Sequence, residues 1–396
     1  MNYILFGDQT RNHLLPFTFT RPIADIRLGI LTLREKWEKL LEAKTSTLTE
    51  DYLSKKYPVV KEADNILINS SVIPNPDIIK ELHQLTPNQT LIVGETIIAL
   101  RLKSEDIDNL DWDVIDSVTP FITQSSPSKV EYLSDLIELN ESQILSDFEM
   151  LTKGRKSAQI PDYVRVTGKG KIFVEKGAVL ENIIINSTEG PVYIGKDAHI
   201  MDGAILRGPV GIGENTIIRM NAMIYGSTSI GPHCKVGGEV SHSIIFGYSN
   251  KAHDGFLGHS VIGEWCNLGA DTNTSNLKNS YETVRLWDYQ EESFVKTNLQ
   301  FCGTFMGDHS KCGINTMFNT ATVVGVAAQI FGAGFMRNFI PSFSWGGSAS
   351  GFSMHNFDKS VDVAKRVYAR RGIDFDKDEV DILRNVYEQT LSYRRL

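Results

Sequence analysis

The amino-acid sequence predicts an α/β N-terminal domain followed by a parallel β-helix of hexapeptide repeats, with helices at the C-terminal end. Three observations support this fold class. In residues 194–236 an aliphatic residue recurs at every sixth position, and a glycine recurs at every eighteenth. Short apolar runs alternate with helical patterns over roughly the first 150 residues.

The six-residue period is the strongest of these signals. It is carried by Ile194, Ile200, Leu206, Ile212, Ile218, Ile224, Ile230 and Val236. An α-helix would show spacings of three and four, and a single strand would show a spacing of two. A period of six is typical of a coil in which each unit forms one short parallel strand and one corner. Gly195, Gly213 and Gly231 are eighteen residues apart, so three units complete one turn of a triangular prism.

The repeat extends well beyond this stretch. It becomes strict at Ile194, slips by two residues after Val236 and resumes at Ile244. Residues 276–298 carry several charges and no such pattern, which indicates an excursion from the coil, and the repeat returns at Met306. We therefore expect roughly nine turns and a prism on the order of 40 Å tall.

The N-terminal region reads as a small domain with a parallel or mixed sheet. Residues 2–6 and 66–69 are expected strands, and 29–43, 76–85 and 128–151 are expected helices. Ligands of such sheets bind at the carboxyl ends of the strands, which here means the loop after Phe6. The expected domains are this α/β domain at 1–153, the β-helix at 154–350 and a helical tail at 351–396.

Composition limits the function classes. The chain has 396 residues, a net charge of −8 and no basic stripe, so nucleic acid is not an expected partner. The N-terminus lacks the charged and apolar regions of a signal peptide, and no apolar run is long enough to cross a membrane. The four cysteines form no CxxC pair. They favour reduced thiols in a cytoplasmic protein and no metal site.

The most polar part of the coil, residues 241–278, is where chemistry is expected. His253 and Asp271 are eighteen residues apart, so an unbroken count would place them at equivalent positions on adjacent turns. A carboxylate beside an imidazole fixes its tautomer and raises its basicity. This pair is the candidate catalytic base and its partner. The alternative is a pair of solvated polar corners.

The motif residues of this segment resemble a known family. Ser249-Asn250-Lys251-Ala252-His253, followed by Asn267-Leu268-Gly269-Ala270 and then Asn276, is similar to the acetyltransferase half of the GlmU family. That family comprises bifunctional N-acetylglucosamine-1-phosphate uridyltransferase/glucosamine-1-phosphate acetyltransferases. The resemblance implies a left-handed coil, a homotrimer, acetyl-CoA as co-substrate and sites between neighbouring subunits.

By the same resemblance His253 takes the position of the catalytic base. Lys251, Asn267, Gly269, Ala270 and Asn276 take positions that line the substrate and acyl-CoA site. The sequence departs from the family where Asp271 replaces a glycine, Leu277 replaces a tyrosine, and Lys278-Asn279 replace Asp-Gly. These departures leave the acceptor sugar open.

The N-terminal domain, 1–153, resembles a shortened nucleotidyltransferase domain with a degenerate motif. Gly7, Thr10, Arg11 and Arg21 are the candidate residues for binding a nucleotide phosphate, since backbone N–H groups and arginines recognise phosphate. The second glycine of the family's loop is missing, and the strand at 66–68 ends in Asn69 where a magnesium-binding aspartate would stand. The resemblance implies Mg²⁺ only if this domain is active.

The sequence thus predicts an acyl-CoA-dependent N-acetyltransferase acting on an amino sugar phosphate, coupled to sugar-1-phosphate nucleotidyl transfer if the N-terminal domain turns over. Two alternatives stay open. One is a non-catalytic scaffold that binds sugar nucleotides. The other is a zinc enzyme like the γ-carbonic anhydrases, which needs three histidines converging on one metal.

Overall fold

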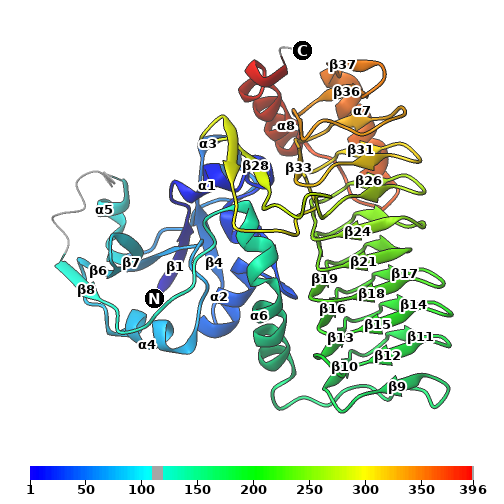
Figure 1. Ribbon diagram of the computed structural model, residues 1–396. Helices are drawn as coiled ribbons and strands as arrows, with labels where there is room; N and C mark the ends of the chain where they lie inside the picture. The colour runs from blue at the N-terminus through cyan, green and yellow to red at the C-terminus, as the bar shows by residue number, and fades with distance from the viewer. Residues whose placement is uncertain (109–118, 395–396) are drawn as a thin grey trace. The chain divides into compact units, whose positions relative to one another are not determined.

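The computed structural model describes residues 1–108 and 119–394. The chain divides into two compact units (Figure 1). The first unit comprises Met1–Leu14, Thr20–Ile26 and Leu31–Tyr132, and the second comprises Leu15–Phe19, Arg27–Ile30 and Leu133–Leu396. The domain limits predicted from the sequence stay a prediction.

The first unit is built on a mixed sheet, one of the two predicted kinds, and this sheet has six strands. In spatial order its strands are β4 (Thr45–Leu48), β1 (Asn2–Phe6), β5 (Asn65–Asn69), β7 (Thr96–Leu102), β6 (Gln89–Val93) and β8 (Thr119–Ile122). Strands β4, β1 and β5 are parallel, β7 runs antiparallel to both its neighbours, and β8 is parallel to β6. The carboxyl ends of β1 and β5 therefore meet at one edge.

The described residues of this unit also form five α-helices. They are α1 (Thr10–His13), α2 (Leu33–Leu41), α3 (Asp51–Ser54), α4 (Pro76–Gln84) and α5 (Ser104–Asp108). The first turn of α2 is fixed by a capping box between Thr32 and Glu35. Helix α4 begins with Asn75 as N-cap and Pro76 at its first position, as the proline predicts. Apolar side chains of both helices pack in one core with those of β1 and β5.

The second unit is dominated by a coil of short parallel strands, visible in Figure 1 as stacked arrows from green to orange. One side consists of β10 (Ile172–Val174), β13 (Val192–Ile194), β16 (Val210–Ile212), β19 (Thr228–Ile230), β22 (Ile244–Ile245), β25 (Val261–Ile262), β30 (Thr304–Met306), β33 (Thr322–Val324) and β35 (Phe339–Ile340). These nine strands agree with the predicted number of turns.

The other two sides are built in the same way. The second consists of β11 (Val179–Leu180), β14 (His199–Ile200), β17 (Ile217–Ile218), β20 (Lys235–Val236), β23 (Asn250–Lys251), β26 (Asn267–Leu268), β31 (Lys311–Cys312), β34 (Gln329–Ile330), β36 (Ser344–Gly347) and β37 (Gly351–Met354), with β37 antiparallel to β36. The third consists of β9 (Arg165–Thr167), β12 (Ile184–Asn186), β15 (Ile205–Arg207), β18 (Met223–Tyr225), β21 (Glu239–Ser241) and β24 (Phe256–Gly258), and is extended by the pair β27 (Asn273–Thr274) and β32 (Met317–Phe318). The handedness implied by the family resemblance stays a prediction.

The strict repeat folds as predicted. From β13 to β17 each strand pairs with the strand eighteen residues further along, as Val192 does with Val210 and Ile217 with Lys235 of β20. All eight aliphatic residues that define the period are at most 2% exposed. Each buried aliphatic side chain contributes roughly 1.5–3 kcal/mol relative to an exposed one. Neighbouring turns therefore stabilise one another through a continuous apolar interior.

The repeat length changes after Val236. Lys235 pairs with Asn250, fifteen residues on, and Asn250 pairs with Asn267, seventeen residues on. Asn267 then pairs with Lys311, forty-four residues on, because the predicted excursion lies between them. The expected unbroken count of eighteen between Ile244 and Thr274 is therefore wrong.

The excursion forms the antiparallel hairpin β28 (Arg285–Asp288) and β29 (Ser293–Lys296). Its Trp287 stacks on Phe339 of the coil, with ring centroids 4.1 Å apart. Tyr289 of the hairpin meets Tyr393 of the tail edge to face, at 5.4 Å. The hairpin is therefore held between the coil and the C-terminal tail.

Up to residue 394, the second unit also contains the α-helices α6 (Leu133–Thr152), α7 (Phe357–Ala369) and α8 (Lys377–Gln389). The Asn140 side chain of α6 donates to the carbonyl of Ser227 and accepts from Ser229 Oγ at 3.0 Å. Helix α6 thus packs along the coil (Figure 1). Helix α7 also packs along its side, where Tyr368 stacks on Trp265. Within the described residues, no helix is long and apolar enough to span a bilayer.

Candidate functional site

His253 lies at a corner of the coil, in the turn that follows β23. Its side chain is exposed. The corner is therefore accessible to a dissolved substrate, as the predicted role of base requires. Its catalytic role stays a prediction.

Asp271 does not occupy the position that the sequence count predicts for it. The backbone N–H of Asp271 donates to the carbonyl of Asp254 at 3.0 Å, so Asp271 stacks on Asp254. The seventeen-residue register puts Ala270 opposite His253. The Asp271 carboxylate accepts instead from Asn273 Nδ2 at 3.1 Å. The spacing argument for Asp271 as the partner of His253 is therefore lost.

Lys251 faces the interior of the coil, contrary to its predicted role in binding acyl-CoA. It pairs in register with buried Val236 and is only 2% exposed. Its Nζ donates to the carbonyl of Gly237 at 3.1 Å and to the carbonyl of His253. Burial lowers the Lys251 pKa to about 8. Lys251 therefore fixes the backbone of the His253 corner from inside.

The predicted residues Asn267, Gly269 and Ala270 lie on the turn next to His253. Asn267 is exposed on the outer face of β26. A Cβ on Gly269 would collide with the backbone of Gly313 on the following turn, so only glycine fits there. The structure brings these three residues and His253 to neighbouring turns of one coil edge.

Asn276 lies at a different corner, with a pair of histidines. Its Nδ2 is 3.0 Å from Nδ1 of His259. The His259 ring stacks on that of His242, with centroids 4.5 Å apart and planes 5° from parallel. Burial, together with the nearby His242, lowers the His259 pKa to about 4, so the ring is neutral at pH 7. His242 and His259 are seventeen residues apart, so a repeat of seventeen places them at equivalent positions on adjacent turns. The expected repeat of eighteen does not.

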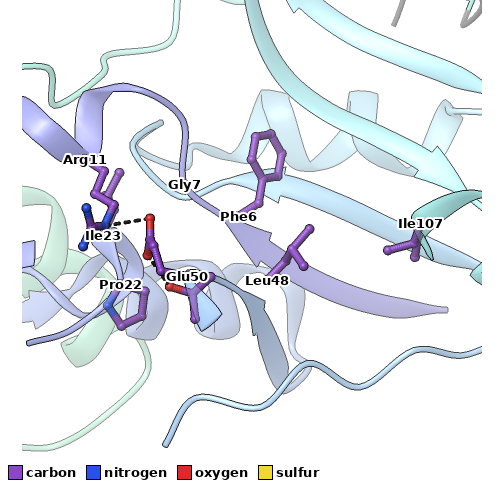
Figure 2. Close-up of a pocket in the computed structure, with 9 residues that line it drawn as sticks. Phe6, Gly7, Arg11, Pro22, Ile23, Leu48, Glu50 and Ile107 are labelled. Carbon is purple, nitrogen blue, oxygen red and sulfur yellow. Dashed lines mark hydrogen bonds and ion pairs between the residues drawn. The ribbon is translucent and has the colours of Figure 1, made fainter. Parts of the chain in front are cut away.

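The predicted phosphate-binding loop of the first unit borders a cavity lined by Gly7 and Arg11 (Figure 2). The Arg11 side chain is already engaged there. Its Nε lies 2.7 Å from Glu50 Oε1, and its Nη2 donates to the Tyr52 hydroxyl at 2.6 Å. Burial raises the Tyr52 pKa to about 12. Arg11 would have to exchange Glu50 for a phosphate in order to bind one.

The other two side chains predicted for this loop are buried. Thr10 is 6% exposed and Arg21 is 5% exposed. The backbone N–H of Thr10 donates to Asp8 Oδ1 at 3.0 Å, which closes the turn after β1. Neither side chain faces solvent freely enough to meet a nucleotide without rearrangement.

Asp8 is the acidic group at the carboxyl edge of β1, and its surroundings do not fit Mg²⁺. Its Oδ2 accepts from Asn69 Nδ2 at 2.9 Å and lies 3.0 Å from Lys129 Nζ. Burial by itself would raise the pKa of Asp8, but its hydrogen bonds and the Lys129 charge together outweigh burial and lower it. A carboxylate that is neutralised by a lysine lacks the free oxygen pair a hard cation prefers. Within residues 1–108 and 119–394, no three histidine, cysteine or acidic side chains converge on a metal-sized site.

Known proteins match parts of this chain. A family described as sugar nucleotidyl transferases matches residues 3–156. The GlmU protein of Methanococcus aeolicus is 36% identical over 87 residues, which is 22% of this chain and 20% of that protein. The bifunctional sugar-1-phosphate nucleotidylyltransferase/acetyltransferase of Sulfurisphaera tokodaii is 33% identical over 157 residues, 39% of this chain and 38% of that protein.

Over part of its length the chain is similar to these GlmU-type bifunctional proteins. It matches only one fifth to about two fifths of the length of these bifunctional relatives. The uncharacterized acetyltransferase YaiX of Escherichia coli is 28% identical over 176 residues, covering 44% of this chain and 74% of that protein. Among solved structures, the polySia-specific acetyltransferase NeuO is 15% identical with a TM-score of 0.30, covering 54% of this chain and 99% of that chain. A likeness this weak carries no argument.

Proposed function

We propose that the chain is an acyl-CoA-dependent N-acetyltransferase that acts on an amino sugar phosphate. The observation that carries this proposal is the exposed His253 corner beside Asn267, Gly269 and Ala270 on a hexapeptide coil. The bifunctional relatives, which are named as nucleotidylyltransferase/acetyltransferases, support it. Acetyl-CoA is the co-substrate in this proposal.

The chemistry requires one base. The amine nitrogen of the sugar attacks the thioester carbonyl carbon, a C–N bond forms and the C–S bond breaks. The imidazole of His253 accepts the proton that the amine loses, and coenzyme A leaves as its thiolate. A positioned imidazole contributes typically 10²–10⁴-fold to such a transfer. Lys251 acts through the His253 backbone, which it holds from inside the coil.

The test is thiol release from acetyl-CoA with glucosamine-1-phosphate and related amino sugar phosphates. We expect His253→Gln to lower kcat by about 10²–10⁴-fold, because the proton acceptor is removed. The matched control is His199→Gln. His199 is a partly exposed coil histidine bonded to Glu181 at 2.6 Å, and it lies three turns before Asn250 of β23, the strand that precedes His253. Unchanged turnover in His253→Gln would refute the base assignment.

Sugar-1-phosphate nucleotidyl transfer is a second candidate activity, favoured by the family match over residues 3–156. The cavity at the carboxyl end of β1 is the proposed nucleotide site, with Arg11 released from Glu50 when phosphate binds. Pyrophosphate release from UTP or dTTP with a sugar-1-phosphate tests it. Binding of the nucleotide without release would favour a sugar-nucleotide-binding scaffold for this unit.

A homotrimer and a cytoplasmic location are part of the same proposal. Sedimentation velocity measures the oligomeric state. A monomer would mean that any complete site lies within one chain. Metal analysis of the purified protein distinguishes a zinc enzyme from an acyltransferase. Zinc bound in a one-to-one ratio would count against acyl transfer.

A further inference from the structure

The outer face of the second side of the coil changes character over four successive turns. Outward positions on β20, β23, β26 and β31 pair directly in register as Lys235, Asn250, Asn267 and Lys311. Adjacent strands are ~4.8 Å apart, so the two lysines are separated by roughly 14 Å with two amides between them. All four residues line a cavity of about 310 Å³.

Helix α7 and the turn after it supply the opposite wall of this cavity. Arg370 and Arg371 follow the last residue of α7 and line the cavity with Val367. Arg371 Nη2 is 3.4 Å from Asn250 Oδ1, so the guanidinium lies over the middle of the row. The tail therefore adds two cations to the two lysines of the coil.

The charged side chains that line this cavity are all basic. Among the described residues that line it, none is an aspartate or a glutamate. Burial and then the charges of Arg371, Arg370 and Arg219 lower the Lys235 pKa, which indicates that these cations repel one another. Burial lowers the Lys311 pKa to about 8. Glu214 and Glu264 lie near Tyr248 and partly offset the field, but neither lines the cavity.

The two aromatic residues that line the cavity, Tyr248 and Trp265, do not offer a free ring face. The rings of His233, Tyr248, Trp265 and Tyr368 form one continuous stack with centroid separations of 4.7, 4.2 and 3.9 Å. Both faces of Tyr248 and of Trp265 are therefore already covered. A ligand in this cavity would be recognised by charge and by amide hydrogen bonds, and not by stacking on these rings.

We propose that this cavity binds a phosphorylated small molecule, whose phosphate group contacts Lys235, Arg370 and Arg371 and whose uncharged part lies along Asn250 and Asn267. Clustered cations without carboxylates are stabilised by a bound anion, and arginine pairs well with phosphate oxygens. A cavity of this size is at the lower end of small-molecule sites. The nucleotide end of coenzyme A and a sugar phosphate both carry such a group, and the probes below distinguish them. The inference concerns binding, and does not require that acyl transfer takes place.

The test is isothermal titration of the full chain with coenzyme A, 3′-dephospho-coenzyme A, glucosamine-1-phosphate and inorganic pyrophosphate. We expect Lys235→Gln and Arg371→Gln each to weaken binding of at least one probe about tenfold or more, as loss of a charge-assisted hydrogen bond implies. The matched control is Arg366→Gln, which removes the same charge from an exposed position on α7 outside the cavity. The affinity of Arg366→Gln for each probe should stay within about twofold of that of the unmodified chain, since surface charges act weakly at a distance.

The probes identify the source of the phosphate. Preference for coenzyme A over its dephospho form, lost in both variants, would assign the site to the acyl donor. Weakened binding of glucosamine-1-phosphate alone would assign it to a sugar phosphate. The proposal is overturned if no probe binds, or if Lys235→Gln and Arg371→Gln bind every probe as tightly as Arg366→Gln does. Urea unfolding of each variant, with an unchanged midpoint, establishes that a loss of binding is local.

Discussion

Two successive parts of the coil, residues 192–236 and residues 237–274, use the same strand-and-corner scheme but differ in what they bury. The first has a constant repeat of eighteen and an interior of aliphatic side chains. The second has repeats of fifteen to seventeen residues and buries Lys251 in the interior column. The candidate base His253 belongs to the second part. The regular turns therefore bury aliphatic side chains, whereas the residues of the proposed site lie where the repeat length changes.

The largest effect is expected from opening the regular interior. Ile212 is fully buried and pairs in register with Ile194 and Ile230. Ile212→Ala should lower the free energy of unfolding by about 2–5 kcal/mol, because it removes apolar contact and leaves a cavity. Urea unfolding measures this. The control is Ile205→Ala on the same coil, where the side chain is 38% exposed and the loss should stay below about 1 kcal/mol.

A second prediction concerns the charge inside the irregular part. The folded pKa of Lys251, about 8, lies below its ordinary value of 10.5. The folded state therefore releases this proton first as pH rises, so the unfolded state holds more protons between about pH 8 and 10.5. Relative to Lys251→Met, the chain should gain stability on the order of 3 kcal/mol across that window. Unfolding free energies of both proteins at pH 7.5 and 10 measure the difference, and parallel pH profiles would contradict it.

A smaller effect is expected from the His242–His259 stack. The folded pKa of His259, about 4, is below its ordinary 6.5, so the folded state resists protonation. As pH falls from 6.5 towards 4, the unfolded state binds the proton first and stability declines. His259→Gln should show a shallower decline over this range. Chemical denaturation at pH 7 and pH 4.5 provides the comparison, and equal slopes for both proteins would show that His259 does not titrate as expected.

The regular part could be predicted from the sequence because its period depends only on repeated burial. The aliphatic residue at every sixth position points inwards. The six-residue period therefore predicts the strands, the number of turns and the interior residues together. The irregular part could not be predicted in this way. A loss of one residue per turn moves Asp271 from His253 to Asp254, and nothing in the letters marks where that residue is lost.

The outcomes at the site residues have similar physical reasons. Lys251 occupies an interior position that a lysine rarely takes. Its side chain points inwards because Nζ donates to the carbonyls of Gly237 and His253, and the sequence does not show that these carbonyls lie within reach. Arg11 lies at the loop after β1 as the sequence predicts, but its partner Glu50 is thirty-nine residues away. Long-range pairing of this kind forms only when the sheet is folded. The position of Gly269, by contrast, follows from its place in the repeat, since a close approach to the next turn is built into such a corner.

The stacked ring of Trp265 has a consequence for observing the protein. Tyr368 of α7 covers one of its faces at 3.9 Å, and the coil residue Tyr248 covers the other at 4.2 Å. The indole emission should therefore change when the tail leaves the coil and one ring face becomes hydrated. The chain carries an optical reporter for the attachment of its own C-terminal helix, readable without any label.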